Sequence, residues 1–279
     1  MNLLPTDHFR VSMDGIYAKE TVMSLLANLV DAVSTGRVEV VDLTAPLTDK
    51  TPVLVLPEPF NQTDRFELRE ISRYDERGPA WYWNNITTGE HTGTHFDAPI
   101  HWVTGRDQAD VSQVPARRLV APAAVLDFTS EAAADPDFLL EVEHVQAWEA
   151  EHGSLPSGGW LLLRTGWDAR SHSQDEFLNA DESGPHTPGV GVECARWLAD
   201  EAPVIGVGVE TVGTDAGRAH SFEPPFPCHA FLLGAGKYGL TQLQNLSALP
   251  PTGAVLIAAP LPIIGGSGSP TRVLALVER

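Results

Sequence analysis

Residues 91–102, HTGTHFDAPIHW, place three histidines and one aspartate close together. Imidazole and carboxylate groups together suit Zn²⁺, Mn²⁺ or Fe²⁺. His91, His95 and Asp97 would form an incomplete ligand set, which leaves coordination positions open for water or substrate, as a catalytic site requires. His101, a fourth ionisable side chain nearby, could move protons. The grouping favours a catalytic metal site over unrelated surface or hydrogen-bonding histidines.

The spacing of these residues requires a bend in the chain. A flat strand rises roughly 3.3 Å per residue, so it would hold His91 and His101 about 33 Å apart. Gly93 permits a bend, and Pro99 ends any regular strand. We therefore expect a bent segment here, and neither a long strand nor a long helix.

The elements that must position this segment are short and of mixed type. Residues 15–36 repeat apolar side chains at the spacing of an amphipathic helix that ends at Gly36. Further helices are expected at 140–153, 189–201 and 228–236, and strands at 37–44, 51–57, 65–75, 123–128, 159–167, 203–213, 253–261 and 271–278. The mixture predicts an α/β fold with a mixed, barrel-like sheet, formed as a single domain by residues 1–279.

Charge and cysteine content narrow the function classes. The formal net charge of -19 disfavours nucleic-acid and anionic-membrane partners, which need a basic patch. The two cysteines, Cys194 and Cys228, are too few for a disulfide framework and favour a reducing compartment. No signal-peptide pattern is visible, and no apolar stretch approaches the roughly 18 residues of a membrane span. We expect a cytoplasmic enzyme or binding protein.

The segment HTGTHFDAPIH also carries a family resemblance. It matches, at every defined position, the His-x-Gly-Thr-His-x-Asp-x-Pro-x-His signature of the cyclase family of metal-dependent hydrolases. The resemblance implies a swivelling β/β/α domain and assembly into homodimers or higher homo-oligomers. It also implies that His91, His95 and Asp97 bind the metal and that His101 is catalytic.

Other stretches resemble the isatin hydrolase branch of this family: EISRYDERGPAWYWNN, GVETVGTDAG and GSGSPTRVLALV. This closer resemblance implies hydrolysis of an amide attached to an aromatic ring, with isatin opened to isatinate. It favours Mn²⁺, with Zn²⁺ also compatible. The alternatives are a kynurenine formamidase acting on N-formylkynurenine, a polyketide-type cyclase, and a non-catalytic protein with a structural metal site.

The resemblance also bears on the number of metal ions. In family members with two ions, the second uses the motif aspartate, a later histidine and a glutamate just before an Asn-Leu pair. His229 matches that histidine, but Gln244 stands at the glutamate position. A neutral amide is a poorer ligand than a carboxylate. We therefore expect one divalent ion, with His229 available to bind substrate.

A few other residues are candidates for substrate contact. Trp81 and Trp83 could wall a site for a flat aromatic substrate or pack in the core, and Gln242 could face the site. Glu210 and Asp215 follow a buried strand, where residues contact ligands, cap turns or support ligating side chains. The glycine-rich GGSGSP (265–270) lacks the Lys-Ser/Thr pair of a phosphate-binding loop, so we interpret it as a turn.

Overall fold

The computed structural model describes residues 24–279. Its longer helices are α1 (Leu25–Ser34), α2 (Thr129–Ala134), α3 (Val142–His152), α4 (Gln174–Leu178), α5 (Val192–Asp200) and the π-helix η7 (Cys228–Leu233). Its 3₁₀ turns are η1 (Pro99–His101), η2 (Val103–Gly105), η3 (Val111–Gln113), η4 (Ala116–Arg118), η5 (Trp167–Arg170), η6 (Ala219–Ser221) and η8 (Leu246–Ala248). Its strands are β1 (Val38–Asp42), β2 (Glu67–Arg73), β3 (Tyr82–Thr87), β4 (His95–Asp97), β5 (Val120–Asp127), β6 (Leu139–Leu140), β7 (Trp160–Arg164), β8 (Ala180–Asp181), β9 (Gly184–Pro185), β10 (Gly189–Val190), β11 (Gly206–Val209), β12 (Tyr238–Thr241), β13 (Ala254–Pro260) and β14 (Gly268–Glu278).

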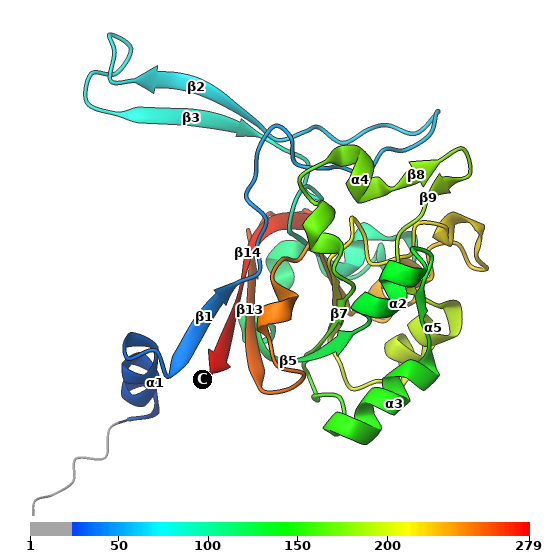
Figure 1. Ribbon diagram of the computed structural model, residues 1–279. Coiled ribbons are helices and arrows are strands. Elements are labelled where there is room, and N and C mark those ends of the chain that lie inside the picture. The colour runs from blue at the N-terminus through cyan, green and yellow to red at the C-terminus, as the bar shows by residue number, and fades with distance from the viewer. Residues whose placement is uncertain (1–23) are drawn as a thin grey trace, which may run out of the picture.

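An eight-stranded sheet forms a barrel (Figure 1). Its strand order is β1-β14-β13-β5-β7-β11-β12-β4, and β14 also pairs with β4. That additional pairing closes the ring and leaves β1 outside it, antiparallel to β14. Parallel pairs, such as β5 with β7, stand beside antiparallel ones, such as β13 with β14. The predicted α/β fold with a mixed, barrel-like sheet is confirmed.

Strand β7 shows how the sequence builds two hydrophobic layers. Trp160 and Leu162 belong to the cluster inside the barrel, whereas Leu161 and Leu163 belong to the cluster shared with α3 and α5. Side chains alternate between the faces of a strand, so a strand buried on both faces is a continuous apolar run. Inside the barrel, Phe96 of β4 packs against Trp160, with ring centroids 6.1 Å apart. Strand β4 is thereby anchored to the core.

Two sequence predictions need correction or restriction. The described part of the predicted helix 15–36 runs from Leu25 to Ser34, while residues 15–23 lie outside the described residues. The predicted strand at 51–57 is wrong, because this segment has no regular secondary structure. The side chain of Gln174 bonds both backbone polar groups of Val53, at 3.0 and 2.7 Å, and takes the place of a neighbouring strand.

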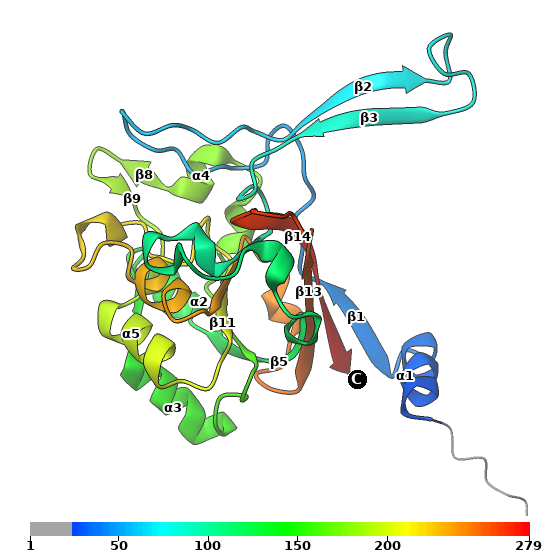
Figure 2. The same ribbon diagram turned by 180° about the vertical axis from the view of Figure 1, so that it is seen from behind.

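The predicted strand at 65–75 is half of a hairpin. Strands β2 and β3 pair with each other, and the hairpin extends away from the barrel (Figures 1 and 2). Trp83 lies in β3 and Trp81 directly precedes this strand, and their side chains are 54% and 50% exposed. None of the helices described in residues 24–279 is both long enough and apolar enough to cross a membrane.

Candidate active site

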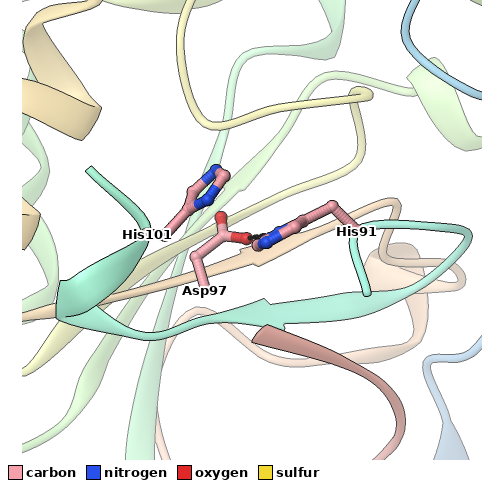
Figure 3. Close-up of side chains that lie close together, drawn as sticks. All are labelled: His91, Asp97 and His101. Atoms are coloured by element: carbon pink, nitrogen blue, oxygen red, sulfur yellow. Dashed lines mark hydrogen bonds and ion pairs between the residues drawn. The ribbon is translucent and has the colours of Figure 1, made fainter. Parts of the chain in front are cut away.

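Bends on both sides of β4 bring the motif residues together. Before β4, Gly93 adopts a φ of +66°, a conformation that L side chains rarely adopt. After β4, Pro99 begins the short turn η1, which ends at His101. As a result, ligand atoms of His91, Asp97 and His101 all lie within 4.8 Å of one another (Figure 3). The predicted bend at Gly93 and Pro99 is confirmed.

Hydrogen bonds define which nitrogen of each histidine faces Asp97. His95 Nδ1 lies 2.7 Å from the carbonyl oxygen of Gly93, which can only accept, so Nδ1 carries the hydrogen. His95 Nε2 is then an acceptor, and it lies 3.3 Å from Asp97 Oδ1. Thr241 Oγ1 lies along the same edge of the ring, 2.9 Å from Nδ1 and 3.0 Å from Nε2. The ring is thus held with Nε2 toward the carboxylate.

His91 presents its other nitrogen to the same oxygen. Its Nδ1 lies 2.7 Å from Asp97 Oδ1, and its Nε2 lies 2.8 Å from Ser267 Oγ. The Ser267 hydroxyl donates to Glu90, so its oxygen accepts from His91 Nε2–H. In this tautomer Nδ1 is also an acceptor. Two histidine lone pairs therefore converge on one carboxylate oxygen.

This donor set fits a divalent metal ion. Acceptor atoms brought this close together repel one another unless a positive charge, a proton or a metal ion, lies among them. Two imidazole nitrogens and a carboxylate suit Zn²⁺ or Mn²⁺. Burial favours the neutral form of Asp97, but positive charge shared with His95 and His91 outweighs it and holds the pKa of this carboxyl well below its usual value. Asp97 is therefore ionised and ready to bind a cation.

Two glycines of the neighbouring strands make room for the ligands. A Cβ at Gly239 of β12 would lie 2.5 Å from Asp97 Oδ2, and a Cβ at Gly268 of β14 would lie 2.6 Å from His91 Cε1. Both glycines pair with Asp97 across the barrel strands. The absence of side chains at these positions lets the barrel wall approach Asp97 and His91, two of the candidate metal ligands, closely.

His101 lies against this group from the other side. Its ring stacks on that of His91, with centroids 3.8 Å apart and planes 24° from parallel. Burial, together with the neighbouring His91 and His229, lowers the pKa of His101 to about 3, although Asp97 acts in the opposite direction. The imidazole is neutral at neutral pH, which is the form that a general base requires.

His229 lies next to His101, and a buried carboxylate orients it. Its ring centroid lies 5.4 Å from that of His101. Asp215 accepts hydrogen bonds from His229 Nδ1–H and from the backbone N–H groups of Cys228 and His229 at the start of η7, the latter two at 2.7 and 3.2 Å. Burial opposes protonation of His229, but Asp215 outweighs it and raises the pKa of His229. Nε2 remains available for substrate.

Two aromatic residues that were not predicted as site residues lie near His229: Trp102 borders it, and Phe226 packs against Trp102. The Trp102 ring lies 4.8 Å from that of His229, and the Phe226 ring lies 5.6 Å from that of Trp102. Phe226 has a φ of +54°, which is sterically unfavourable for a bulky side chain and is typical of functional loops. Trp102 directly follows His101, and this adjacency was the available sequence signal.

The remaining candidates lie apart from the metal-binding residues or behind them. Trp81 and Trp83 are on the projecting hairpin. Gln242 is buried and its backbone oxygen accepts from Thr94 Oγ1 of the motif at 2.7 Å. Its Oε1 has no hydrogen-bond partner among residues 24–279. The Gln244 side chain contacts Ser171 Oγ at 3.3 Å.

Glu210 forms hydrogen bonds with the backbone of a neighbouring loop. Its Oε2 accepts hydrogen bonds from the backbone N–H groups of Thr165 and Trp167, at 2.7 and 3.1 Å, and so orders the loop that follows β7. Burial raises the pKa of Glu210 to about 7 despite these hydrogen bonds. Glu210 therefore organises the barrel edge.

Comparisons with known proteins agree with this geometry. A family model, Cyclase, matches residues 41–216. An isatin hydrolase of Roseibium aggregatum is 47% identical over 262 residues, which cover 93% of this chain and 99% of that protein. A kynurenine formamidase of Salinibacter ruber is 30% identical over 196 residues, which cover 68% of this chain and 77% of that protein.

Solved structures show the same fold. The crystal structure of an isatin hydrolase bound to the product analogue thioisatinate superimposes with a TM-score of 0.89 at 47% identity. The superposition covers 92% of this chain and 100% of that one. A structure described as a potential metal-dependent hydrolase with cyclase activity matches with a TM-score of 0.61 at 26% identity. This chain therefore belongs to the cyclase family of metal-dependent hydrolases.

Proposed function

We propose that this protein hydrolyses isatin to isatinate with one divalent metal ion bound by His91, His95 and Asp97. The observation that carries the proposal is the convergence of one ring nitrogen each of His91 and His95 on Asp97 Oδ1, at 2.7 and 3.3 Å, beside His101. Similarity to isatin hydrolases along nearly the whole chain supports the substrate.

The side chains have separate roles in the reaction. A bound divalent ion supplies a water of lowered pKa and polarises the amide carbonyl. His101 accepts the proton of the attacking water and returns it to the ring nitrogen as the C–N bond of the cyclic amide breaks. The water oxygen remains in the new carboxylate. His229, oriented by Asp215, donates Nε2–H to the carbonyl oxygen as negative charge develops there.

Aromatic side chains would hold the substrate. Trp102 borders His229, Phe226 packs against Trp102, and both offer flat apolar surfaces to the ring of isatin. Gln242 Oε1, which is buried and unpaired among the described residues, is a candidate acceptor for the N–H of the substrate. An unpaired buried acceptor is costly, so a ligand that supplies a donor would gain affinity.

Trp81 and Trp83 would contribute to the active site of a second copy of the chain. They lie on a hairpin that projects from its own barrel, and a lone two-stranded hairpin is marginally stable in water. Leu68 and Ile86 on the same hairpin are also exposed. We propose a homodimer in which the hairpin of one subunit packs on its partner and brings these tryptophans to the partner's active site.

We also propose the identity of the metal ion and the location of the protein in the cell. Mn²⁺ is the preferred ion and Zn²⁺ is compatible with the same ligands. Gln244 in place of a carboxylate favours one ion over two. The whole chain would form one domain and act in the cytoplasm without nucleic-acid or membrane partners. The free buried thiols of Cys194 and Cys228 and the net charge of -19 support this setting.

The second candidate function is kynurenine formamidase activity. It is favoured by the 30% identical relative, and both substrates carry an acyl group on an aniline nitrogen. The test is a parallel assay of isatin and N-formylkynurenine with the Mn²⁺-loaded protein. A kcat/KM at least about tenfold higher for isatin supports the proposal, since tenfold corresponds to about 1.4 kcal/mol of transition-state discrimination. A kcat/KM that is higher for N-formylkynurenine would make kynurenine formamidase activity the proposed function instead.

A further inference from the structure

Glu90 and Ser267 lie behind His91, on the side of its ring that faces away from Asp97. Ser267 Oγ lies 2.8 Å from His91 Nε2. Its hydroxyl donates to Glu90 Oε2 at 2.6 Å, and its backbone N–H donates to the same oxygen at 3.0 Å. These contacts connect residue 90, next to the first candidate ligand, with a glycine-rich turn in which Ser267 lies 177 positions later in the chain.

We propose that Glu90 and Ser267 are positioning residues for the metal ligand His91. The inference rests on the metal site of the proposed function and extends it to two residues that do not touch the ion. The chemistry of the groups sets the direction of these hydrogen bonds. The carboxylate of Glu90 can only accept, so Ser267 donates to it and must accept from His91.

The consequence is a defined tautomer of His91. With its hydrogen on Nε2, the lone pair of Nδ1 points toward Asp97, from which it lies 2.7 Å away. Partners of this kind orient a ligating histidine, and their loss typically weakens metal affinity or activity by about 10- to 100-fold. His95 is oriented in the same manner by the Gly93 carbonyl, which no side-chain substitution removes. The tautomer of His91 therefore depends on side chains that can be replaced, whereas that of His95 depends on a backbone carbonyl.

The turn itself is shaped to carry Ser267. The Gly266 carbonyl accepts from Val111 N–H at 2.9 Å, and Ala98 N–H donates to the Ser267 carbonyl at 2.9 Å. These backbone contacts fix the turn to the segments next to the metal motif. The backbone hydrogen bonds and the Glu90–Ser267 pair would be enough to hold the turn in place. The additional hydrogen bond between Ser267 and His91 gives the pair a role at the metal.

Calorimetric titration of metal-stripped protein with Mn²⁺ tests the proposal. Ser267→Ala should raise the Kd for Mn²⁺ about 10- to 100-fold. Glu90→Gln should raise it less, because glutamine keeps an oxygen for Ser267 but lacks the charge. The double variant should resemble Ser267→Ala, since residues acting in series are not additive. Thermal unfolding without metal reports any loss of folding separately.

Ser269→Ala is the matched control. Ser269 is two positions further along, and among residues 24–279 its hydroxyl forms hydrogen bonds with backbone groups only, those of Leu261 and Pro270. This variant should bind Mn²⁺ with wild-type affinity. Wild-type affinity in both Ser267→Ala and Glu90→Gln would overturn the positioning role while the metal site and isatin hydrolysis stand. A wild-type protein that binds no Mn²⁺ but turns over isatin would instead remove the metal assignment and this inference with it.

Discussion

The rings of His91 and His101 are stacked, with centroids 3.8 Å apart, although ten positions separate them in the chain. A straight strand would hold them about 33 Å apart. The bends at Gly93 and Pro99 therefore bring His91, His95, Asp97 and His101 together from one continuous segment. In the proposed mechanism, His91 of this stacked pair binds the metal ion and His101 transfers the proton.

His101→Ala should lower kcat by about 10²- to 10⁴-fold, because a general base is lost, and should leave the Mn²⁺ stoichiometry at one. Asp97→Asn should lose both metal and turnover. Isatin turnover and metal analysis of the purified variants measure both effects. His172→Ala, at an exposed histidine, is the control for the loss of an imidazole. Loss of metal in His101→Ala would make His101 a ligand and contradict its role as base.

Gly268→Ala should weaken Mn²⁺ binding and destabilise the fold by about 1–3 kcal/mol. The added methyl group would clash with the backbone oxygen of Phe96 and lie 2.6 Å from His91 Cε1, so β4 or the His91 ring must shift. Urea unfolding of metal-free protein and Mn²⁺ titration separate the two effects. Unchanged metal affinity in this variant would show that His91 tolerates displacement and does not ligate the ion.

Much of this site could be predicted from the sequence, and the rest depends on long-range contacts. His91, His95, Asp97 and His101 lie within one segment, and their spacing with Gly93 and Pro99 already required a bend. The apolar run of β7 likewise identified a buried strand. Local patterns of this kind are visible because the interacting residues are neighbours in the chain.

The missed features join distant segments. Ser267 reaches His91 only because β14 closes the barrel against β4, so GGSGSP could be identified as no more than a turn. Asp215 orients His229 across a loop. The segment 51–57 has the composition of a strand, but a side chain of α4, Gln174, satisfies its backbone. No local pattern reports such tertiary partners.

Glu210 should make stability depend on pH. Its pKa is about 7 in the folded protein and near 4.5 when exposed, so the folded state holds the proton more tightly. The resulting stabilisation is fully present below pH 4.5 and is lost as the pH rises through about 7. Glu210→Gln should flatten this dependence between pH 4.5 and 7, as measured by urea unfolding at a series of pH values. Parallel curves for wild type and variant would show that the carboxyl of Glu210 has an ordinary pKa.

Mixing two inactive variants tests the exchange of hairpins between subunits. His101→Ala keeps its hairpin, and the double variant Trp81→Ala/Trp83→Ala keeps its catalytic histidine. After subunit exchange at equal concentrations, activity should rise to about a quarter of wild type, because half of the dimers are mixed and one of their two sites is intact. Light scattering confirms that dimers form. Activity equal to the mean of the two separate variants would contradict a shared active site.

The most direct test of the central claim is isatin opening by metal-stripped protein before and after Mn²⁺ is added, followed through the loss of visible absorbance of isatin. We expect no turnover without metal and full turnover when one equivalent is bound at His91, His95 and Asp97. Mn²⁺ bound at one equivalent with no isatin consumed would contradict the proposed function and leave only the metal site.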